Sequence, residues 1–398
     1  MIRLVALCLL AGCELFANIP DGTFVPAPDV PAGSCVTGEV ACTDPTPVCR
    51  TDTETCVECI GDGDCGGLPC DLATNTCAPG CLTDDQCPSG ACLADRTCAD
   101  EPRILYAAPA GAGDCSRAMP CALETAVSLL SVGRDVIQLA EGTHLTANPV
   151  TIAANAILNG TNAVIQVPAG QFGFTHSAVA VQYHRLAIEA PGGGIPVQCQ
   201  SAGTLSLVDV ELRNSGAALF SSTCTVEIDR SKLSTNASFA FSISGGVLTI
   251  KNSFITNNGN TGVVIGTMLM DAIGADSIVE HTTIAGNLND GSQASAMGCS
   301  NGPGPTFKNS IIRNNSIPPS CVVGNSVIDP GYAGTGTDNL ILDPAFVDPV
   351  GGNYHLMPGS PVANLASALP TTLTVDADRQ ARPQPAGSQP DFGADEIP

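Results

Sequence analysis

Aromatic side chains are scarce in this chain of 398 residues: they make up 4% of it, and tryptophan is absent. A core must therefore be built from Val, Ile, Leu and Ala. Glycine and proline are abundant, with 42 and 30 residues, so frequent turns are expected. This composition indicates a β protein with narrow layers rather than a helical protein.

Basic side chains are also few. The 15 Lys and Arg residues stand against 38 Asp and Glu, which gives a formal net charge of −23. Nucleic acids and anionic membrane surfaces bind basic patches, so this balance argues against either as a partner of the folded surface. The acidity is most simply a source of solubility.

Several compact catalytic motifs are missing. The sequence has no P-loop and no HExxH. The run "GCSNG" at 298–302 matches G-x-S-x-G, a pattern found around nucleophilic serines. It lies in a Gly- and Pro-rich loop rather than at a strand-turn-helix junction. Ser300 is therefore not predicted to be a nucleophile, and Cys299 is assigned to a disulfide.

The amino-terminal apolar run is too short to span a membrane. Residues 1–12 combine a basic residue, this run and small residues, which is the pattern of a secretory signal peptide. The following Leu10-Ala11-Gly12-Cys13 closely resembles the lipobox of bacterial lipoproteins, which implies cleavage before Cys13 and a diacylglycerol on its sulfur. Glu14 follows, where Asp would signal inner-membrane retention. We expect a membrane anchor at Cys13, in the outer membrane or at the cell surface, and a lipidated tether over 13–34.

Cysteine is plentiful, with 20 residues. Cys8 leaves with the signal peptide and Cys13 takes lipid, so 18 remain, an even number in an oxidising compartment. Twelve of them fall within 35–99 as repeats similar to those common in lipoproteins of predatory and soil-dwelling Gram-negative bacteria. Each repeat is too short to bury a core, so disulfides must replace one, and the sequence leaves their pairing open. The three runs are Cys35, Cys42, Cys49 and Cys56; Cys59, Cys65, Cys70 and Cys77; and Cys81, Cys87, Cys92 and Cys98.

Metal binding is the alternative reading of the Cys-rich segment. A zinc site would rest on the C-x-x-C from Cys56 to Cys59, and disulfides are favoured over it. Acidic loop residues are candidate Ca²⁺ ligands, but solvated loop carboxylates are the simpler interpretation. We predict no metal site and no cofactor, with Ca²⁺ left open. The acidic residues are Asp62, Asp64, Asp84 and Asp85.

One short pattern recurs along the rest of the chain. The stretch "LTIKNSFITNNG" at 248–259 alternates aliphatic and polar residues, shifts parity at a polar corner and returns to an inward aliphatic at Ile255. This indicates two short strands that meet at a corner, and most copies recur at intervals of 21 to 29 residues, which marks a solenoid. Coils of about 22 residues stacked at ~4.8 Å form a parallel β-helix. The equivalent aliphatic positions are Leu186, Leu212, Leu233, Ile255, Ile284, Ile312 and Ile328.

Three further regularities fit a stack of coils. Asparagines at one position predict an internal ladder of side-chain amides. Charges at another position alternate in sign, which predicts pairing between neighbouring coils. Cysteines fall in near pairs, and in two of these pairs the two residues are about one coil apart in the sequence. His184 and His281 lie in copies of the repeat and are expected to be exposed. The sets are Asn236, Asn258, Asn287 and Asn315; Asp229, Lys251, Glu280 and Lys308; and Cys115 with Cys121, Cys199 with Cys224, and Cys299 with Cys321.

Both ends of the solenoid resemble known modules. Residues 106–127, "YAAPAGAGDCSRAMPCALETAV", are similar to the amino-terminal cap of bacterial pectate-lyase-like β-helix proteins. Apolar spacing from Leu123 to Leu130 predicts a short amphipathic helix there, and coils are expected to begin near Asp135. Residues 340–396, with "DPAFVD", "YHL", "PGSP" and "PDFGA", resemble the terminal module of right-handed parallel β-helix repeat proteins called choice-of-anchor Q. The chain departs from that pattern at "NLA" (364–366) and at Asp395, where an aromatic residue is customary.

The predicted fold class is all-β: a right-handed parallel β-helix solenoid with a short N-terminal cap helix, preceded by a small disulfide-rich module. The expected domains are a lipoprotein signal peptide (1–12), a lipidated tether (13–34), Cys-rich disulfide repeats (35–99), the β-helix with its N-terminal cap (100–339) and a choice-of-anchor-Q-like C-terminal cap (340–398).

The resemblance to pectate-lyase-like enzymes implies where a catalytic site would lie. Those enzymes bind Ca²⁺ through outward carboxylates on adjacent coils, and an Arg or Lys abstracts a sugar proton. Alignment of the copies sets Asp209 against Arg230 and Glu211 against Lys232, a pairing that would hold the basic residues protonated. The candidate catalytic residues are Asp209, Glu211, Asp229, Arg230 and Lys232.

We therefore predict a non-enzymatic, lipid-anchored cell-envelope protein. Its rigid β-helix would bind a polysaccharide or a surface protein, or have a structural role at the surface. The alternative is a Ca²⁺-dependent polysaccharide lyase or a glycoside hydrolase of pectate-lyase-like fold, an idea that rests on analogy of fold. The Gly-His-Gly triplet usual in hydrolases of this fold is absent, and few aromatic side chains exist for sugar stacking.

Overall fold

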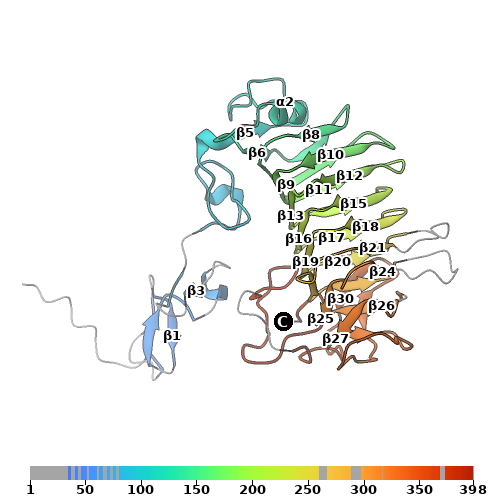
Figure 1. The fold of residues 1–398 in the computed structure, drawn as a ribbon. Coiled ribbons are helices and arrows are strands. Elements are labelled where there is room, and N and C mark those ends of the chain that lie inside the picture. Colours follow the sequence, from blue (N-terminus) through green and yellow to red (C-terminus); the bar gives the residue numbers. More distant parts are fainter. Residues whose placement is uncertain are drawn as a thin grey trace, which may run out of the picture. The chain divides into compact units, whose positions relative to one another are not determined.

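The computed structural model describes residues 35–36, 41–43, 46–51, 53–60, 62–65, 70–71, 75–77, 80–259, 267–287, 297–315, 317–367 and 373–397 (Figure 1). The predicted signal peptide (1–12), the lipid-bearing Cys13 and the tether (13–34) lie outside these residues. The chain divides into two compact units, residues 1–78 and 79–398, and each is considered by itself. Within the described part, no helix is long and apolar enough to span a membrane.

The first unit consists of short antiparallel strand pairs held by disulfides. The strands are β1 (Val48–Arg50) with β2 (Thr55–Val57), and β3 (Cys70–Asp71) with β4 (Thr76–Cys77), beside the short helix η1 (Asp62–Cys65). Disulfides join Cys35 to Cys49, Cys42 to Cys56, and Cys65 to Cys77. Because the sulfur of Cys56 is bonded to Cys42, the C-x-x-C at 56–59 does not form a zinc site.

The third Cys-rich repeat belongs to the second unit, although the sequence grouped it with the other two in 35–99. Its disulfides join Cys81 to Cys92 and Cys87 to Cys98 around the short helix η2 (Asp84–Gln86), and η3 (Glu101–Arg103) leads into the coils. The division into two compact units thus falls after Ala78, before the third repeat.

Asp84 explains why the third repeat joins the coils. Its carboxylate accepts hydrogen bonds from Gln138 Nε2 at 3.1 Å, Asn159 Nδ2 at 3.2 Å and Thr161 Oγ1 at 2.8 Å, and it forms an ion pair with Arg185. Hence Asp84 is neither a Ca²⁺ ligand nor a solvated loop carboxylate. Its oxygens are already occupied by donors from the first coils.

The second unit is a stack of coils in which each turn crosses two sheets (Figure 1). One is a seven-stranded parallel sheet. The other is bent, so that most coils place one strand before a corner and one after it, while two long strands pass through the corner. The seven-stranded sheet contains β8 (Val150–Ile152), β10 (Phe172–Ser177), β12 (Ile195–Gln200), β15 (Ala217–Ser222), β18 (Phe239–Ser244), β21 (Met268–Asp271) and β24 (Met297–Ser300).

The pre-corner strands of the bent sheet are β5 (Ile104–Ala107), β6 (Val136–Leu139), β13 (Thr204–Val208), β16 (Thr225–Asp229), β19 (Val247–Lys251), β22 (Ile278–Glu280), β25 (Thr306–Lys308) and β27 (Val322–Gly324). The post-corner strands are β7 (Gly142–Leu145), β14 (Glu211–Arg213), β17 (Lys232–Ser234), β20 (Phe254–Thr256), β23 (Thr283–Ala285), β26 (Ile311–Arg313) and β28 (Val327–Ile328). β9 (Ala156–Gln166) and β11 (Ala180–Glu189) run through the corner.

The repeat predicted from the sequence is the repeat of the structure, except that Ile188, and not Leu186, lies in register with Leu212. Post-corner strands pair in parallel so that Leu212, Leu233, Ile255, Ile284, Ile312 and Ile328 lie in register from coil to coil. All of them are buried, in one core that extends through the stack. Successive side chains on a strand point to opposite faces, so these aliphatics fix which face of each coil is inward. The solenoid prediction is confirmed.

Two ladders of side-chain hydrogen bonds run along the stack. The asparagine ladder was predicted: Asn236 Nδ2 donates to Asn258 Oδ1 at 2.8 Å, and Asn258 Nδ2 donates to Asn287 Oδ1 at 2.9 Å. The second ladder is of serines at the corner, where Ser231 N–H donates to Ser253 Oγ at 3.1 Å. In the sequence, Ser253 marked only the point where the alternation of inward and outward residues shifts. In the structure, its hydroxyl accepts the backbone N–H of Ser231, which has no partner in the sheet at the corner.

Disulfides and short segments complete the stack. The structure pairs Cys199 with Cys224, Cys299 with Cys321 and Cys115 with Cys121, the near pairs noted in the sequence. At the N-terminal end, α2 (Leu123–Ser128) buries Leu123, Ala126 and Val127 over the coils. The bent sheet begins at β5, one strand earlier than the expected start near Asp135, because β5 pairs in parallel with β6.

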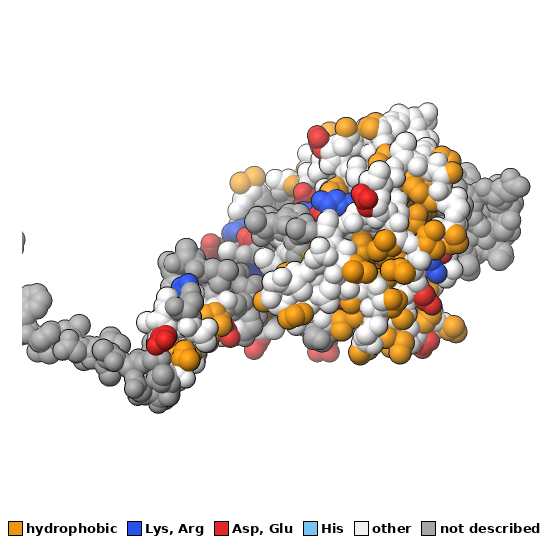
Figure 2. All heavy atoms as spheres, turned by 90° about the horizontal axis from the view of Figure 1, so that it is seen from below, with side chains coloured by type: hydrophobic (Ala, Val, Ile, Leu, Met, Phe, Trp, Pro, Cys, Tyr) orange, Lys and Arg blue, Asp and Glu red, His pale blue; other side chains and the backbone are white. Residues whose placement is uncertain are grey.

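The C-terminal segment does more than cap the end of the stack. Its antiparallel hairpin, β29 (Phe346–Asp348) with β30 (Asn353–Leu356), and the residues after it lie against the outer side of the post-corner strands. Outward Phe254, Ala285 and Ile311 are buried for this reason. The predicted cap over 340–398 is thus a side cover as well. Figure 2 shows this end of the molecule from below, with apolar side chains gathered in several groups and acidic ones scattered among them.

Candidate binding groove

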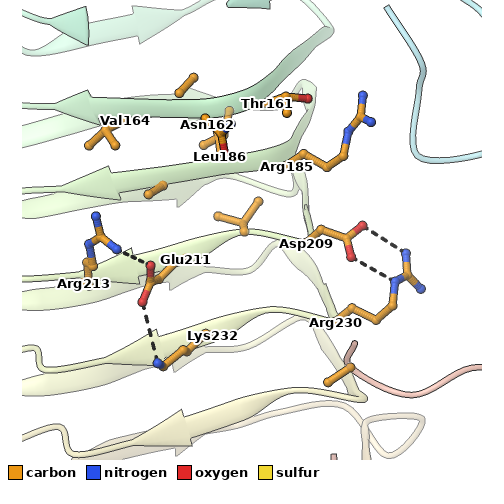
Figure 3. Close-up of a pocket in the computed structure, with 14 residues that line it drawn as sticks. Thr161, Asn162, Val164, Arg185, Leu186, Asp209, Glu211, Arg213, Arg230 and Lys232 are labelled. Carbon is orange, nitrogen blue, oxygen red and sulfur yellow. Dashed lines mark hydrogen bonds and ion pairs between the residues drawn. The ribbon is translucent and has the colours of Figure 1, made fainter. Parts of the chain in front are cut away.

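A groove of about 740 Å³ lies on the outer side of the post-corner strands, next to the C-terminal cover (Figure 3). Its lining comes from β9, β11, β14, β17 and their corners, with Ala377 contributed by the cover. Apolar side chains such as Val164 and Ala187 line it together with charged ones. The groove is the part of this side that the cover leaves open.

Alternation along the strands determines which side chains reach the groove. On β14, Leu212 is buried in the core, so its neighbours Glu211 and Arg213 point outward. Lys232 begins β17 and points outward because Leu233 is buried. β14 and β17 pair in register and place Glu211 beside Lys232.

A second set of charges comes from the corner itself. Arg185, Asp209 and Arg230 occupy the corner in successive coils, with positive φ angles of 53°, 55° and 45°. Later coils have Asn252 and Asn309 at this position, and Asn adopts this left-handed backbone more readily than Arg does. The conformation costs an arginine about 1–2 kcal/mol, which its ion pairs help to offset.

Asp209 is surrounded by basic side chains. Arg230 Nε donates to its Oδ1 at 3.1 Å, Arg379 Nη2 donates to its Oδ2 at 2.7 Å, and His184 Nε2 lies 3.5 Å from Oδ2. Burial alone would raise the pKa of Asp209, but the nearby His184 ring and the charges of Arg230 and Arg379 hold that pKa well below its usual range. Asp209 is therefore an anion throughout the physiological pH range.

Glu211 and Arg213 form the opposite part of the charged lining. Arg213 bonds Glu211 through Nη1 and donates from Nε to Glu189 Oε1 at 2.7 Å. Lys232 Nζ lies 3.9 Å from Glu211 Oε1. The hydrogen bond to Glu189 raises the pKa of Arg213, so its guanidinium stays charged. Figure 3 shows Glu211 reaching toward both Arg213 and Lys232.

The structure brings four of the five candidate residues into one groove: Asp209, Glu211, Arg230 and Lys232. Both ion pairs expected from the alignment, Asp209 with Arg230 and Glu211 with Lys232, are present. Asp229 lies on the other side of the corner, where it pairs with Arg230 and lines a smaller depression of about 400 Å³ with Glu227 and Lys251. Burial raises the pKa of Asp229.

Sequence reasoning missed Arg185, Arg213 and Arg379. Arg213 could have been predicted, because in "VELR" (210–213) it is the next outward position after Glu211. Arg379 could not, because it lies 170 residues from Asp209 and meets it only through the C-terminal cover. Arg185 pairs with Asp84 of the third repeat, a contact that the repeat pattern does not encode.

His184 and His281, the two histidines that lie in copies of the repeat, are buried rather than exposed, contrary to expectation. His184 is 1% exposed because the third repeat and Asp209 enclose it, and its Nδ1 bonds Asn159 Oδ1 at 2.7 Å. His281 is fully buried, with Nε2 3.0 Å from Asn309 Nδ2, because the C-terminal cover lies over that corner. Burial lowers the pKa of both rings.

The groove does not suit a Ca²⁺ ion of the lyase kind. Ca²⁺ requires several oxygens converging at 2.3–2.6 Å. Within the described ranges, the carboxylates of the groove are not among the groups whose ligand atoms converge, and Asp209 is already surrounded by basic side chains. The converging groups are three Cys sets of the disulfide repeats and one formed by His355, Asp378 and Asp395.

Comparison with known proteins agrees with the stack of coils. The family model described as right handed beta helix region matches residues 193–344. The second unit is a right-handed parallel β-helix. The crystal structure of pectate lyase Pel9A is similar over 75% of this chain and 97% of that chain, at 15% identity and a TM-score of 0.37. No curated protein matches the sequence. What the β-helix does must be argued from the groove.

Proposed function

We propose that this protein is a non-catalytic, lipid-anchored binding protein of the cell envelope, and that the groove of its β-helix holds an uncharged, hydroxyl-rich glycan. The observation that carries the proposal is that every charge of the groove already has a partner. Five basic and five acidic side chains belong to the network. They are Arg185, Arg213, Arg230, Lys232 and Arg379, with Asp84, Glu189, Asp209, Glu211 and Asp229.

Such balance supports a neutral ligand over a polyanion. A polyanionic chain gains affinity from unpaired positive charge, and here five positive charges face five negative ones. Each pair nevertheless keeps hydrogen-bonding capacity: a guanidinium has five N–H donors and a carboxylate about four lone-pair sites. Arg213 uses Nε and Nη1 for its two carboxylates. The N–H groups of its Nη2 therefore suit a sugar hydroxyl.

The same pairing argues against catalysis. A lyase needs a deprotonated base beside the sugar. Burial alone would lower the pKa of Arg230, but Asp229 and Asp209 outweigh it and raise that pKa. Arg213 is also held charged. A polysaccharide lyase or hydrolase remains the competing function, and the experiment below separates the two.

Membrane attachment is supported by the sequence of the amino terminus. A lipobox ending at Cys13 supplies an acyl anchor, and two or three acyl chains are enough for stable attachment. A rigid stack of coils at the cell surface would then present the groove to polysaccharide outside the cell. A surface protein is the other class of partner that such a stack suits.

The test is a panel of neutral and acidic polysaccharides, measured for binding by calorimetry and for turnover by release of unsaturated or reducing ends. We expect saturable binding of a neutral glycan without turnover. Lys232→Ala and Arg213→Ala should each weaken binding about tenfold, the effect of one or two hydrogen bonds. Lys251→Ala is the matched control, because Lys251 lies across the corner, outside the groove. Turnover that Lys232→Ala abolishes would establish the enzyme instead.

A further inference from the structure

The C-terminal cover brings three metal-binding side chains together from three separate segments. His355 lies on β30, Asp378 lies in the loop after Val375, and Asp395 lies near the end of the chain. One ligand atom from each is within 4.8 Å of the other two. His355 Nε2 is 2.7 Å from Asp378 Oδ2. None of the three contributes to the groove.

The ring of His355 is oriented by a hydrogen bond at Nδ1, as is usual for a metal-binding histidine. Asn353 Oδ1 accepts the backbone N–H of His355 at 3.1 Å and bonds its Nδ1 at 2.6 Å. Since Oδ1 accepts the backbone N–H, it must also be the acceptor for Nδ1, so Nδ1 carries a proton. A hydrogen bond at the far nitrogen is what usually fixes the tautomer of a ligating histidine. Nε2 is therefore the nitrogen offered to the carboxylates.

Asp395 gives an independent reason to expect a cation. Its side chain is 5% exposed, and its Oδ2 accepts the backbone N–H of Leu356 at 2.6 Å. No donor in the described part of the chain reaches its Oδ1 within hydrogen-bond distance. The nearby Arg382 is engaged by Glu396, at 3.1 Å from Oε2. The Oδ1 of Asp395 is not enclosed by the protein, so it is open to a cation from solvent, and carboxylate oxygens are ligands that Zn²⁺ accepts.

We propose that His355, Asp378 and Asp395 bind a divalent transition-metal ion, with Zn²⁺ the best fit. Zn²⁺ accepts both imidazole nitrogen and carboxylate oxygen as ligands, while Ca²⁺ takes oxygen ligands. Three protein ligands leave a fourth position open to water or to an outside group. His355 and Asp378 are 39% and 44% exposed, so the ion has access from solvent. The bound ion would join β30, the 375–381 loop and the chain end.

Without the metal, a proton takes its place. Both nitrogens of His355 then face acceptors, an arrangement that favours the protonated ring, and the ring packs on Phe254 of β20 with ring centres 5.0 Å apart. The hydrogen bond to Asp378 raises the pKa of His355, and Asp395 and Asp376 add to it. Metal and proton compete for Nε2, so metal affinity is expected to rise with pH.

The experiment uses the full mature chain, stripped with chelator and titrated with ZnCl₂ by calorimetry at about pH 5 and about pH 8. We expect one Zn²⁺ per chain, bound more tightly at the higher pH, and a Co²⁺-loaded form with the visible spectrum of a nitrogen- and oxygen-ligated site. Asn353→Ala leaves all three ligands in place but removes the hydrogen bonds that Asn353 Oδ1 accepts from the backbone N–H and Nδ1 of His355, so it should weaken binding about 10–100-fold. His355→Ala and Asp395→Asn should weaken it further.

Asp348→Asn is the matched control, because Asp348 is exposed on β29 of the same segment. It should leave the affinity unchanged. Circular dichroism checks that each variant is folded. If His355→Ala is unstable, Asp395→Asn serves as the test, because asparagine keeps an oxygen that can accept the Leu356 N–H. The proposal is overturned if no saturable binding occurs at either pH. It is equally overturned if folded Asp395→Asn or His355→Ala binds Zn²⁺ as the parent does.

Discussion

Replacing Asp84 by alanine tests whether the third Cys-rich repeat is an integral part of the β-helix unit. Asp84 and Arg185 form an ion pair in which the side chains are 18% and 12% exposed. Removing one partner of a buried pair typically costs about 3–5 kcal/mol, because the other charge is left uncompensated. Arg185 would keep its bonds to the carbonyls of Leu82 and Cys92, at 2.9 and 2.8 Å. We therefore expect the lower end, about 3 kcal/mol.

The assay is hydrogen exchange of the segment 81–98, combined with denaturant unfolding of the chain. Asp84→Ala should expose that segment to exchange and lower its opening free energy. Asp85→Ala is the matched control: Asp85 is exposed, and a surface substitution should change stability by no more than about 0.5 kcal/mol.

A double-mutant cycle separates the pair from the rest of the contact. With Arg185→Ala alongside, the double variant should cost less than the sum of the single ones, because neither charge is then left alone. The reasoning is refuted if Asp84→Ala behaves like Asp85→Ala, or if the two single effects simply add. Either result would mean that the third repeat lies loosely against the coils.

Two further predictions concern the two ends of the chain. Cys13→Ser should abolish incorporation of labelled fatty acid into the protein in cells, while Cys8→Ser should not, because Cys8 is expected to leave with the signal peptide; labelling that survives Cys13→Ser would contradict the anchor. In the C-terminal cover, burial raises the pKa of Asp376 to about 6 from its ordinary 3.8. Ionising it costs more in the folded than in the unfolded chain, so the free energy of unfolding should fall, by roughly 1–3 kcal/mol, as the pH rises from about 4 to about 6. Asp376→Asn should flatten that slope in denaturant titrations, and an unchanged slope would assign it to another group.

The solenoid was predictable because its causes repeat. Ile255 and Ile284 recur at one position of every coil, and each occurrence strengthens the inference from the others. Asn236 and Asn258 could be predicted for the same reason: a ladder of amides needs the same residue at the same place. The paired charges of the groove followed from this alignment, since Glu211 and Lys232 occupy neighbouring coils in register.

The surroundings of the coils were less predictable because they do not repeat. Phe254 and Ile311 are outward apolar residues that make sense only with the C-terminal cover over them. His184 and His281 read as exposed members of the stack until the third repeat and the cover enclose them. Arg379 reaches Asp209 across 170 residues of chain, and no local pattern reports such a contact.

The C-terminal cover also limits where turns can be added to the stack. Solenoids commonly lengthen or shorten by whole repeats, since each repeat contacts only its neighbours. Here Arg379 bonds Asp209 and Tyr354 Oη donates to Asn257 Oδ1 at 2.6 Å, so the C-terminal cover is bonded to two different turns of the stack. One extra turn between Asp209 and Asn257 would add about 4.8 Å to the distance between these two contacts, so at least one of them would break. We therefore expect no gain or loss of repeats between Asp209 and Asn257. Homologues with a different number of coils should differ outside these turns.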